Sequence, residues 1–183
     1  AIPTCTSGAN NNVGVGASAL GLCTGGDRNT AIGSNALQDN TTAGDNTAVG
    51  YIALAANTTG AQNVAVGKGA LDANTTANDN TAVGHAALGA NTTGTHNVGV
   101  GGSALTKNTT ASYSTAVGTN ALGANTTGSY NAAFGNSALA LNTTGEYNVA
   151  FGTFALDDNT TADYNTALGH NALGANTTGT QNT

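Results

Sequence analysis

Apolar and polar side chains follow a pattern along this chain that repeats every seventeen residues. The unit reads Asn-Thr-Ala-Val-Gly, two variable residues, Ala-Leu, two variable residues, Asn-Thr-Thr-Gly and two more variable residues. Ten consecutive units run from Asn12 to Gln181 without insertion or deletion. A short fixed period is typical of a solenoid, in which each unit is one coil that buries its apolar side against its neighbours.

The spacing within each unit predicts two short β-strands separated by turns. Two positions of the unit are never polar, and we expect their side chains to form two interior ladders. The fourth position holds Val15, Ile32, Val49, Val66, Val83, Val100, Val117, Phe134, Phe151 and Leu168, and the ninth holds Leu20, Leu37, Leu54, Leu71, Leu88, Leu105, Leu122, Leu139, Leu156 and Leu173. The invariant glycine at the fifth position (Gly16 through Gly169) and the Asn-Thr-Thr segment are predicted to make the two turns.

The predicted fold is therefore all-β: a parallel β-solenoid, or β-roll, of ten 17-residue coils with two short strands per coil. Stacked at the strand spacing of about 4.8 Å, these coils would form a rod of roughly 45 to 50 Å. Residues 1–11 are expected to be a leader that caps the first coil, residues 12–181 the solenoid, and residues 182–183 the start of an eleventh repeat. Either the chain continues beyond Thr183, or the coils of one molecule stack on those of another.

The third position of every unit is Ala or Gly and the eighth is Ala, as in Ala31 and Ala36. On regular strands, these small residues would occupy the face opposite the two ladders. Two explanations remain open at this stage. A bulge could turn both neighbours inward into one crowded core, or the small face could pack against another copy, most simply around a three-fold axis.

Composition and charge argue against several classes of function. The chain has three basic residues (Lys and Arg together) and nine acidic residues (Asp and Glu together), which gives a net charge of −6, and it has no Trp or Met. No basic stripe is available for nucleic acid, and no apolar run approaches the roughly twenty residues of a membrane helix. The first residue, Ala1, suggests a chain from which a signal peptide has been removed. We therefore expect a secreted protein, with neither nucleic-acid binding nor membrane insertion.

The two cysteines, Cys5 and Cys23, lie in the leader and the first coil. A disulfide between them would fix the leader over the open end of the solenoid, with a stabilisation of about 3 kcal/mol. Such a bond favours an oxidising, extracellular setting. The alternative is two unpaired, buried thiols.

An Asn-Thr-Thr triplet occurs in nine of the ten units, and each is an Asn-x-Thr glycosylation sequon. The candidate glycosylation sites are Asn40, Asn57, Asn74, Asn91, Asn108, Asn125, Asn142, Asn159 and Asn176. The alternative, which we favour, is a ladder of asparagine amides hydrogen-bonded to the coils above and below, since glycans at strand spacing would crowd one another. Cys23 takes the asparagine's place in the first coil.

The threonines of these triplets predict two parallel files of hydroxyl and methyl groups. A flat, rigid and regularly spaced threonine array can order water, so these residues are a candidate ice-binding or ligand-binding face. They are Thr41, Thr42, Thr58, Thr59, Thr75, Thr76, Thr92, Thr93, Thr109, Thr110, Thr126, Thr127, Thr143, Thr144, Thr160, Thr161, Thr177 and Thr178. The second position of the unit, mostly Thr or Val, adds to this hypothesis because the two side chains have nearly the same shape. Threonine is also a good strand and turn residue in its own right.

Four tyrosines occupy the last position of four successive units: Tyr113, Tyr130, Tyr147 and Tyr164. They are predicted to stack as a short aromatic file near one corner of the coil. A sugar-binding platform and a subunit contact are two readings of this file. A ladder that only reinforces the stack is the simpler one.

Catalysis finds little support in the sequence. His85 and His170 share a coil position but lie five coils apart, and His96 lies elsewhere in its coil. No cofactor motif and no repeated metal-ligand spacing is present. The adjacent pair Asp157 and Asp158 offers at most a weak calcium site, and we predict that the protein is not an enzyme.

The repeats also carry a resemblance to known families. Asn46 to Leu54 reads Asn-Thr-Ala-Val-Gly-Tyr-Ile-Ala-Leu, and Asn165 to Leu173 reads Asn-Thr-Ala-Leu-Gly-His-Asn-Ala-Leu. These runs resemble the repeats of trimeric autotransporter adhesin heads of the YadA type, of phage-type tail fibres, and of surface proteins with an endosialidase-type chaperone domain. The resemblance implies a trimeric β-roll or fibre that projects from a cell or virion. It covers residues 12–181 but rests on a short, low-complexity motif, and the adhesin repeat is typically shorter.

Together these patterns predict an extracellular structural fibre or adhesive rod. Its main partners would be other copies of itself, as a trimer or an end-to-end filament, and surface glycans are a further candidate partner. The alternative function is ice binding through the threonine files.

Overall fold

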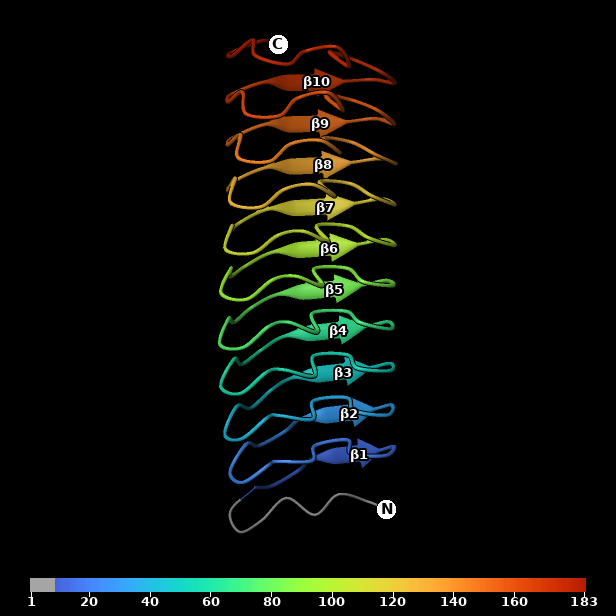
Figure 1. Ribbon diagram of the computed structural model, residues 1–183, viewed down its shortest axis with the longest axis vertical. Coiled ribbons are helices and arrows are strands. Elements are labelled where there is room, and N and C mark those ends of the chain that lie inside the picture. Colours follow the sequence, from blue (N-terminus) through green and yellow to red (C-terminus); the bar gives the residue numbers. More distant parts are fainter. Residues whose placement is uncertain (1–8) are drawn as a thin grey trace.

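The computed structural model describes residues 9–183, which form a rod of stacked coils with one strand in each coil (Figure 1). Within these residues there are ten strands and no helix. The strands are β1 (Val13–Val15), β2 (Thr30–Ile32), β3 (Thr47–Val49), β4 (Val64–Val66), β5 (Thr81–Val83), β6 (Val98–Val100), β7 (Thr115–Val117), β8 (Ala132–Phe134), β9 (Val149–Phe151) and β10 (Thr166–Leu168).

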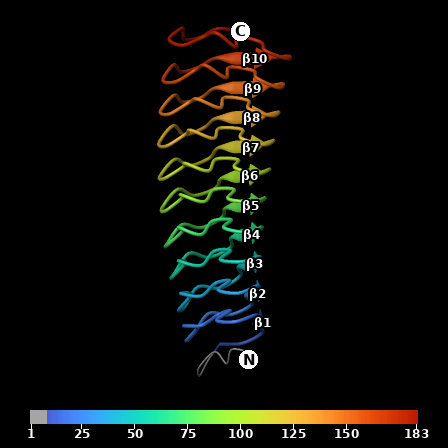
Figure 2. The same ribbon diagram turned by 45° about the vertical axis from the view of Figure 1, so that its right-hand side comes forward.

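The ten strands form a single parallel sheet in the order of the chain, from β1 to β10. Each strand residue pairs with the residue seventeen positions later, as Thr47 pairs with Val64. This register confirms the parallel β-solenoid with a 17-residue coil. Figure 2 shows that the sheet covers one side of the rod while loops form the rest of each coil.

The other sides of the coil are held to their neighbours by backbone hydrogen bonds of the same kind. The Leu54 N–H donates to the carbonyl of Ala70 at 2.9 Å, and the Thr58 N–H donates to the carbonyl of Thr75 at 2.9 Å. Backbone groups outside the strands are therefore also paired between successive coils, as buried backbone requires.

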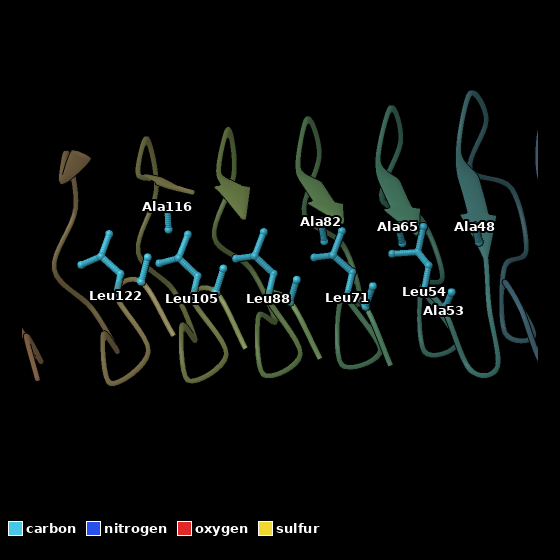
Figure 3. Packing of buried hydrophobic residues seen from close by; sticks show 14 of the residues in the cluster. Ala48, Ala53, Leu54, Ala65, Leu71, Ala82, Leu88, Leu105, Ala116 and Leu122 are labelled. Atoms are coloured by element: carbon cyan, nitrogen blue, oxygen red, sulfur yellow. The ribbon is translucent and has the colours of Figure 1, made fainter. Parts of the chain in front are cut away.

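The interior is a thin column of alanine and leucine. The leucines of the ninth position are fully buried from Leu37 to Leu156, and the alanines of the third and eighth positions lie beside them. Figure 3 shows these leucines following one another along the rod, with Ala48, Ala65 and Ala82 beneath their strands. The predicted leucine ladder is confirmed, although Leu173 in the last coil is 36 % exposed.

The prediction of two strands per coil is wrong. The segment that contains the leucine is a series of turns, because the seventh and ninth residues of the coil adopt left-handed backbone conformations. Leu54, for example, has φ of 52°, and Ile52 two residues before it also has φ of 52°. This backbone bends the chain tightly while the leucine side chain still points inward.

The prediction of an interior ladder at the fourth position is also wrong. In the strands, the third residue of the coil is buried while the second and fourth residues face outward. Ala48, for example, is buried, and Thr47 and Val49 on either side of it are half-buried. The third residue faces a filled column: a Cβ added to Gly99 would already lie 3.3 Å from the carbonyl oxygen of Ala104 and 3.4 Å from Cγ of Leu88 in the preceding coil. The small third residues therefore belong to the core, and neither the bulge nor a packing face of small residues is present in the strands.

The glycine of the fifth position makes the turn after each strand, as predicted. Its φ ranges from +126° to +141° over the ten coils, a region that only glycine adopts readily. The glycines also stack closely. A Cβ on Gly84 would lie 2.5 Å from the carbonyl oxygen of Gly101.

Candidate functional site

The outward side of the sheet is the most regular apolar surface of the rod. We call it the strand face and define it by the second and fourth residues of each coil. The second residues are Val13, Thr30, Thr47, Val64, Thr81, Val98, Thr115, Ala132, Val149 and Thr166, and the fourth residues are the Val15 to Leu168 series given above. None of the twenty carries a charge, whereas charged residues occur at several other positions of the coil.

Exposure along the strand face is greatest toward the two ends of the sheet. Val15 is 56 % exposed in the first coil, and Phe151 and Leu168 are 55 % and 77 % exposed in the last two. In between, side chains such as Val66 and Val83 are half-buried, since each is partly covered by the equivalent side chains of the coils above and below. Phe134 and Phe151 stack with ring centroids 5.5 Å apart.

The sequence analysis found only half of the strand face, since it named the second residues as part of a flat outward surface but placed the fourth residues inside. The signal for it was present in the third position, since a position restricted to Ala and Gly is one where side-chain volume is limited.

The threonine edge, formed by the Thr pairs of the Asn-Thr-Thr triplets, lies on the loop side of the coil. The first threonine of each pair is half-buried through most of the rod, and its hydroxyl is engaged: Thr58 Oγ1 donates to the carbonyl of Thr75 at 3.0 Å, and the same bond recurs from Thr41 to Thr143. The second threonine, such as Thr59, is exposed. Of the two predicted files, only the second therefore presents hydroxyl groups that these bonds do not occupy.

The asparagines of the triplets form the predicted hydrogen-bonded ladder. Asn57 Nδ2 donates to Oδ1 of Asn40 at 3.1 Å and to the carbonyl of Gly60 at 2.8 Å, and the pattern continues coil after coil. The asparagines from Asn40 to Asn159 are fully buried, and Asn176 is half-buried. Because Nδ2 is buried and hydrogen-bonded, through both hydrogens from Asn57 to Asn159, the folded rod offers no acceptor for a glycan at the buried positions.

A second asparagine ladder, at the first position of the coil, was not singled out from the sequence. The Oδ1 of Asn46 accepts a hydrogen bond from the backbone N–H of Asn63 at 3.0 Å, and Asn46 Nδ2 donates to the carbonyl of Gly60 at 3.0 Å. Ser114 takes the asparagine's place in one coil. Within residues 9–183 no buried side-chain nitrogen or oxygen lacks a hydrogen-bond partner.

The predicted Cys5–Cys23 disulfide concerns one residue outside the described part of the chain. Cys23 is 4 % exposed and is not a free thiol, whereas Cys5 lies outside residues 9–183. The pairing therefore stays a prediction.

The four tyrosines stack as predicted. Their successive ring centroids lie 5.2, 4.9 and 5.1 Å apart and their planes differ by 3° or less. The file is longer than expected by one ring, because His96 stacks on Tyr113 at 4.8 Å and lies 3.6 Å from a carboxylate oxygen of Asp79. Each tyrosine ring is about half exposed, and desolvation raises the pKa of Tyr147, as do the neighbouring Tyr130 and Glu146.

The ionisable groups form pairs but no reactive cluster in the described residues. Arg28 forms a two-pronged ion pair with Asp45, which holds the pKa of that carboxyl group below its usual value. Burial raises the pKa of Asp72. Across residues 9–183 there is no pocket and no group of three or more potential metal ligands, Asp157 and Asp158 included. A search of the same residues also finds no helix able to cross a membrane.

By its fold the chain is a parallel β-solenoid. No family model matches it, and comparison with curated proteins and with solved structures gives no match. The function must therefore be argued from the surfaces described above.

Proposed function

We propose that the protein is a structural rod that associates with other copies of itself through the strand face, to build an extracellular fibre or adhesive rod. The observation that carries this proposal is the outward Val, Ile, Phe or Leu at the fourth position of all ten coils, with Val15, Phe151 and Leu168 more than half exposed. An extended apolar surface of this kind is unusual on a monomer and is typical of an interaction site.

A second copy is the partner that fits this surface. The face repeats at the strand spacing of about 4.8 Å, and only a surface with the same period can make the same contact at every coil. A face about 43 Å long, with the three strand residues of each coil giving about 10 Å across, offers roughly 430 Å² in projection. This is about half of the roughly 800 Å² that each partner contributes to a stable interface, so the turns beside the strands must contribute the rest.

The place of action we propose is outside the cell, on a cell or virion surface. The support is the predicted disulfide of Cys23 and the low charge of a rod whose stability comes from hydrogen-bonded ladders. The surface or glycan that such a rod would touch is not indicated by any pocket in residues 9–183.

The test is the state of association. Val66→Lys and Val83→Lys together place two charges in the strand face, and we expect this variant to be monomeric by light scattering where the unaltered protein forms oligomers. Thr76→Lys with Thr93→Lys, in the same two coils but on the threonine edge, is the matched control and should assemble normally. A monodisperse monomer of the unaltered protein would overturn the proposal.

Ice binding is the second candidate function, and the structure favours a different surface for it from the one that the sequence suggested. The strand face presents Thr and Val outward in strict register, as at Thr47 and Val64, on a hydrogen-bonded sheet. The threonine edge instead has half of its hydroxyls engaged with the backbone. Flatness, regular spacing and methyl groups therefore favour the strand face for ordered water.

Thermal hysteresis of the freezing point separates these possibilities. If the strand face binds ice, Thr81→Tyr abolishes hysteresis and Thr93→Tyr on the threonine edge in the same coil does not. The reverse result would place ice binding at the threonine edge. No hysteresis in the unaltered protein would remove ice binding from consideration.

A further inference from the structure

The aromatic file is the surface feature that self-association alone does not explain. Tyr113, Tyr130, Tyr147 and Tyr164 are parallel, spaced at about 5 Å and between 43 and 55 % exposed. We propose that these four tyrosines are a site of oxidative cross-linking, at which dityrosine bonds join neighbouring rods. This inference rests on the proposed function, because it requires two copies side by side.

Tyrosine is the most readily oxidised type of side chain in the described residues. The sequence has no Trp and no Met, and the buried Cys23 is not a free thiol. A radical formed on one ring faces the next ring directly, so an electron can move along the stack and share the radical among the four positions. Tyr51, the one tyrosine outside the file, is exposed but has no stacked aromatic neighbour among residues 9–183.

The chemistry needs a one-electron oxidant, which a peroxidase with hydrogen peroxide supplies. Each of two phenols loses one electron and its hydroxyl proton to give a tyrosyl radical. The two radicals form a carbon–carbon bond between their ortho carbons, and each ring then moves the hydrogen of that carbon to its oxygen to restore the phenol. In sum, two tyrosines and one hydrogen peroxide give one dityrosine and two water molecules.

The geometry of the file favours bonds between rods over bonds within one rod. Coupling requires the edges of two rings to meet, but neighbours in the file face each other with planes within 3°. The edges turned to solvent are the ones that remain free, and only another molecule can reach them.

The position of the file places these edges beside the proposed interface. Each tyrosine lies two residues before a strand: Tyr113 precedes β7 and Tyr164 precedes β10. The file therefore follows the rim of the strand face along the upper half of the rod in Figure 1. Two rods joined through their strand faces in opposite directions keep their tyrosine files at the same edge of the interface, and overlap of the halves that contain β7 to β10 brings the two files close together.

The experiment treats the assembled protein with a peroxidase and hydrogen peroxide, then measures dityrosine fluorescence and covalent oligomers on a denaturing gel. We expect covalent oligomers whose cross-linked peptides contain the four file tyrosines. A variant with all four changed to Phe keeps the stacked rings but loses the phenols, and should lose the covalent oligomers. Tyr51→Phe is the control and should cross-link like the unaltered protein.

Three results would overturn the inference while the rods still assemble by light scattering. They are absence of dityrosine, dityrosine confined to single chains, and cross-links that persist in the four-Phe variant. Failure of the proposed function is a separate result, since it appears as a monomer before any oxidant is added. The Val66→Lys, Val83→Lys variant links the two: its covalent oligomers should decrease with its assembly, and undiminished cross-linking there would also count against the inference.

Discussion

At the scale of single residues, asparagine does what no other side chain in the rod can do. Its short amide has one acceptor oxygen and two N–H donors, and the ladder uses them in a fixed direction along the rod. Asn91 Nδ2 donates to Oδ1 of Asn74 at 3.2 Å and to the carbonyl of Gly94 at 2.9 Å, while Asn91 Oδ1 accepts from Asn108. Aspartate lacks the donors and glutamine is too long for this corner.

Asn91→Ala removes one step of this ladder in the middle of the rod. Oδ1 of Asn74 and a hydrogen of Asn108 Nδ2 then lose their partner while remaining buried, whereas the carbonyl of Gly94 keeps its hydrogen bond from Asn80 Nδ2. Unsatisfied buried polar groups destabilise by roughly 1–3 kcal/mol each, so we expect the free energy of unfolding to decrease by about 2–4 kcal/mol. Urea denaturation measures it. Thr93→Ala, in the exposed position of the same triplet, should change it by less than about 0.5 kcal/mol, and equal losses in the two variants would contradict this account.

At the scale of the coil, the sequence predicted the repeat and its stacking but not the path of the chain between stacked positions. The invariant period of seventeen fixes which residues lie over one another, and pairs such as Thr47 with Val64 follow directly. The number of strands was wrong because leucine ordinarily avoids the left-handed conformation that Leu54 and its equivalents adopt. Burial of the side chain and the inter-coil bond of the Leu54 N–H hold it there.

The candidate site was only partly predictable for a related reason. The two-residue period of a strand showed that neighbouring strand residues face opposite ways. The size of the side chains was interpreted wrongly, so the larger Val49 was placed inside and the smaller Ala48 outside. The interior is so narrow that Leu54 and Ala53 already fill it, and only a methyl group fits from the strand side. The asparagine ladder and the tyrosine stack were predicted correctly, since both follow from identical residues at one coil position.

Gly101→Ala tests the turn that follows each strand. The φ of Gly101 is +132°, and an added Cβ would lie 2.6 Å from the backbone of Gly118 in the next coil. Strain and overlap together should lower the free energy of unfolding by about 3 kcal/mol or more. Gly102→Ala is the neighbouring control, since an added Cβ there meets nothing within 4 Å. A thermal unfolding midpoint of Gly101→Ala close to that of Gly102→Ala would refute this role of the turn.

At the scale of the whole molecule, each coil is bonded only to the coils directly above and below it. The sheet pairs β1 with β2, β2 with β3 and so on to β10, with no crossover. The stability of such a stack is close to the sum of coil and nearest-neighbour contributions. A whole coil should therefore be removable without damage to the rest, which a globular core would not allow.

Deletion of residues 80–96 tests this directly, because it removes one coil and joins Asp79, the last residue of its coil, to Asn97, which takes the place of the equivalent Asn80. We expect a folded rod with an unchanged circular dichroism signal per residue and a modestly lower urea midpoint. Deletion of residues 80–88 removes fewer residues but takes Ala82, Ala87 and Leu88 from the core and leaves eight residues that cannot complete a coil. It should destabilise the rod far more than the longer deletion. If instead the shorter deletion were the better tolerated of the two, the period of seventeen would not be what holds the coils together.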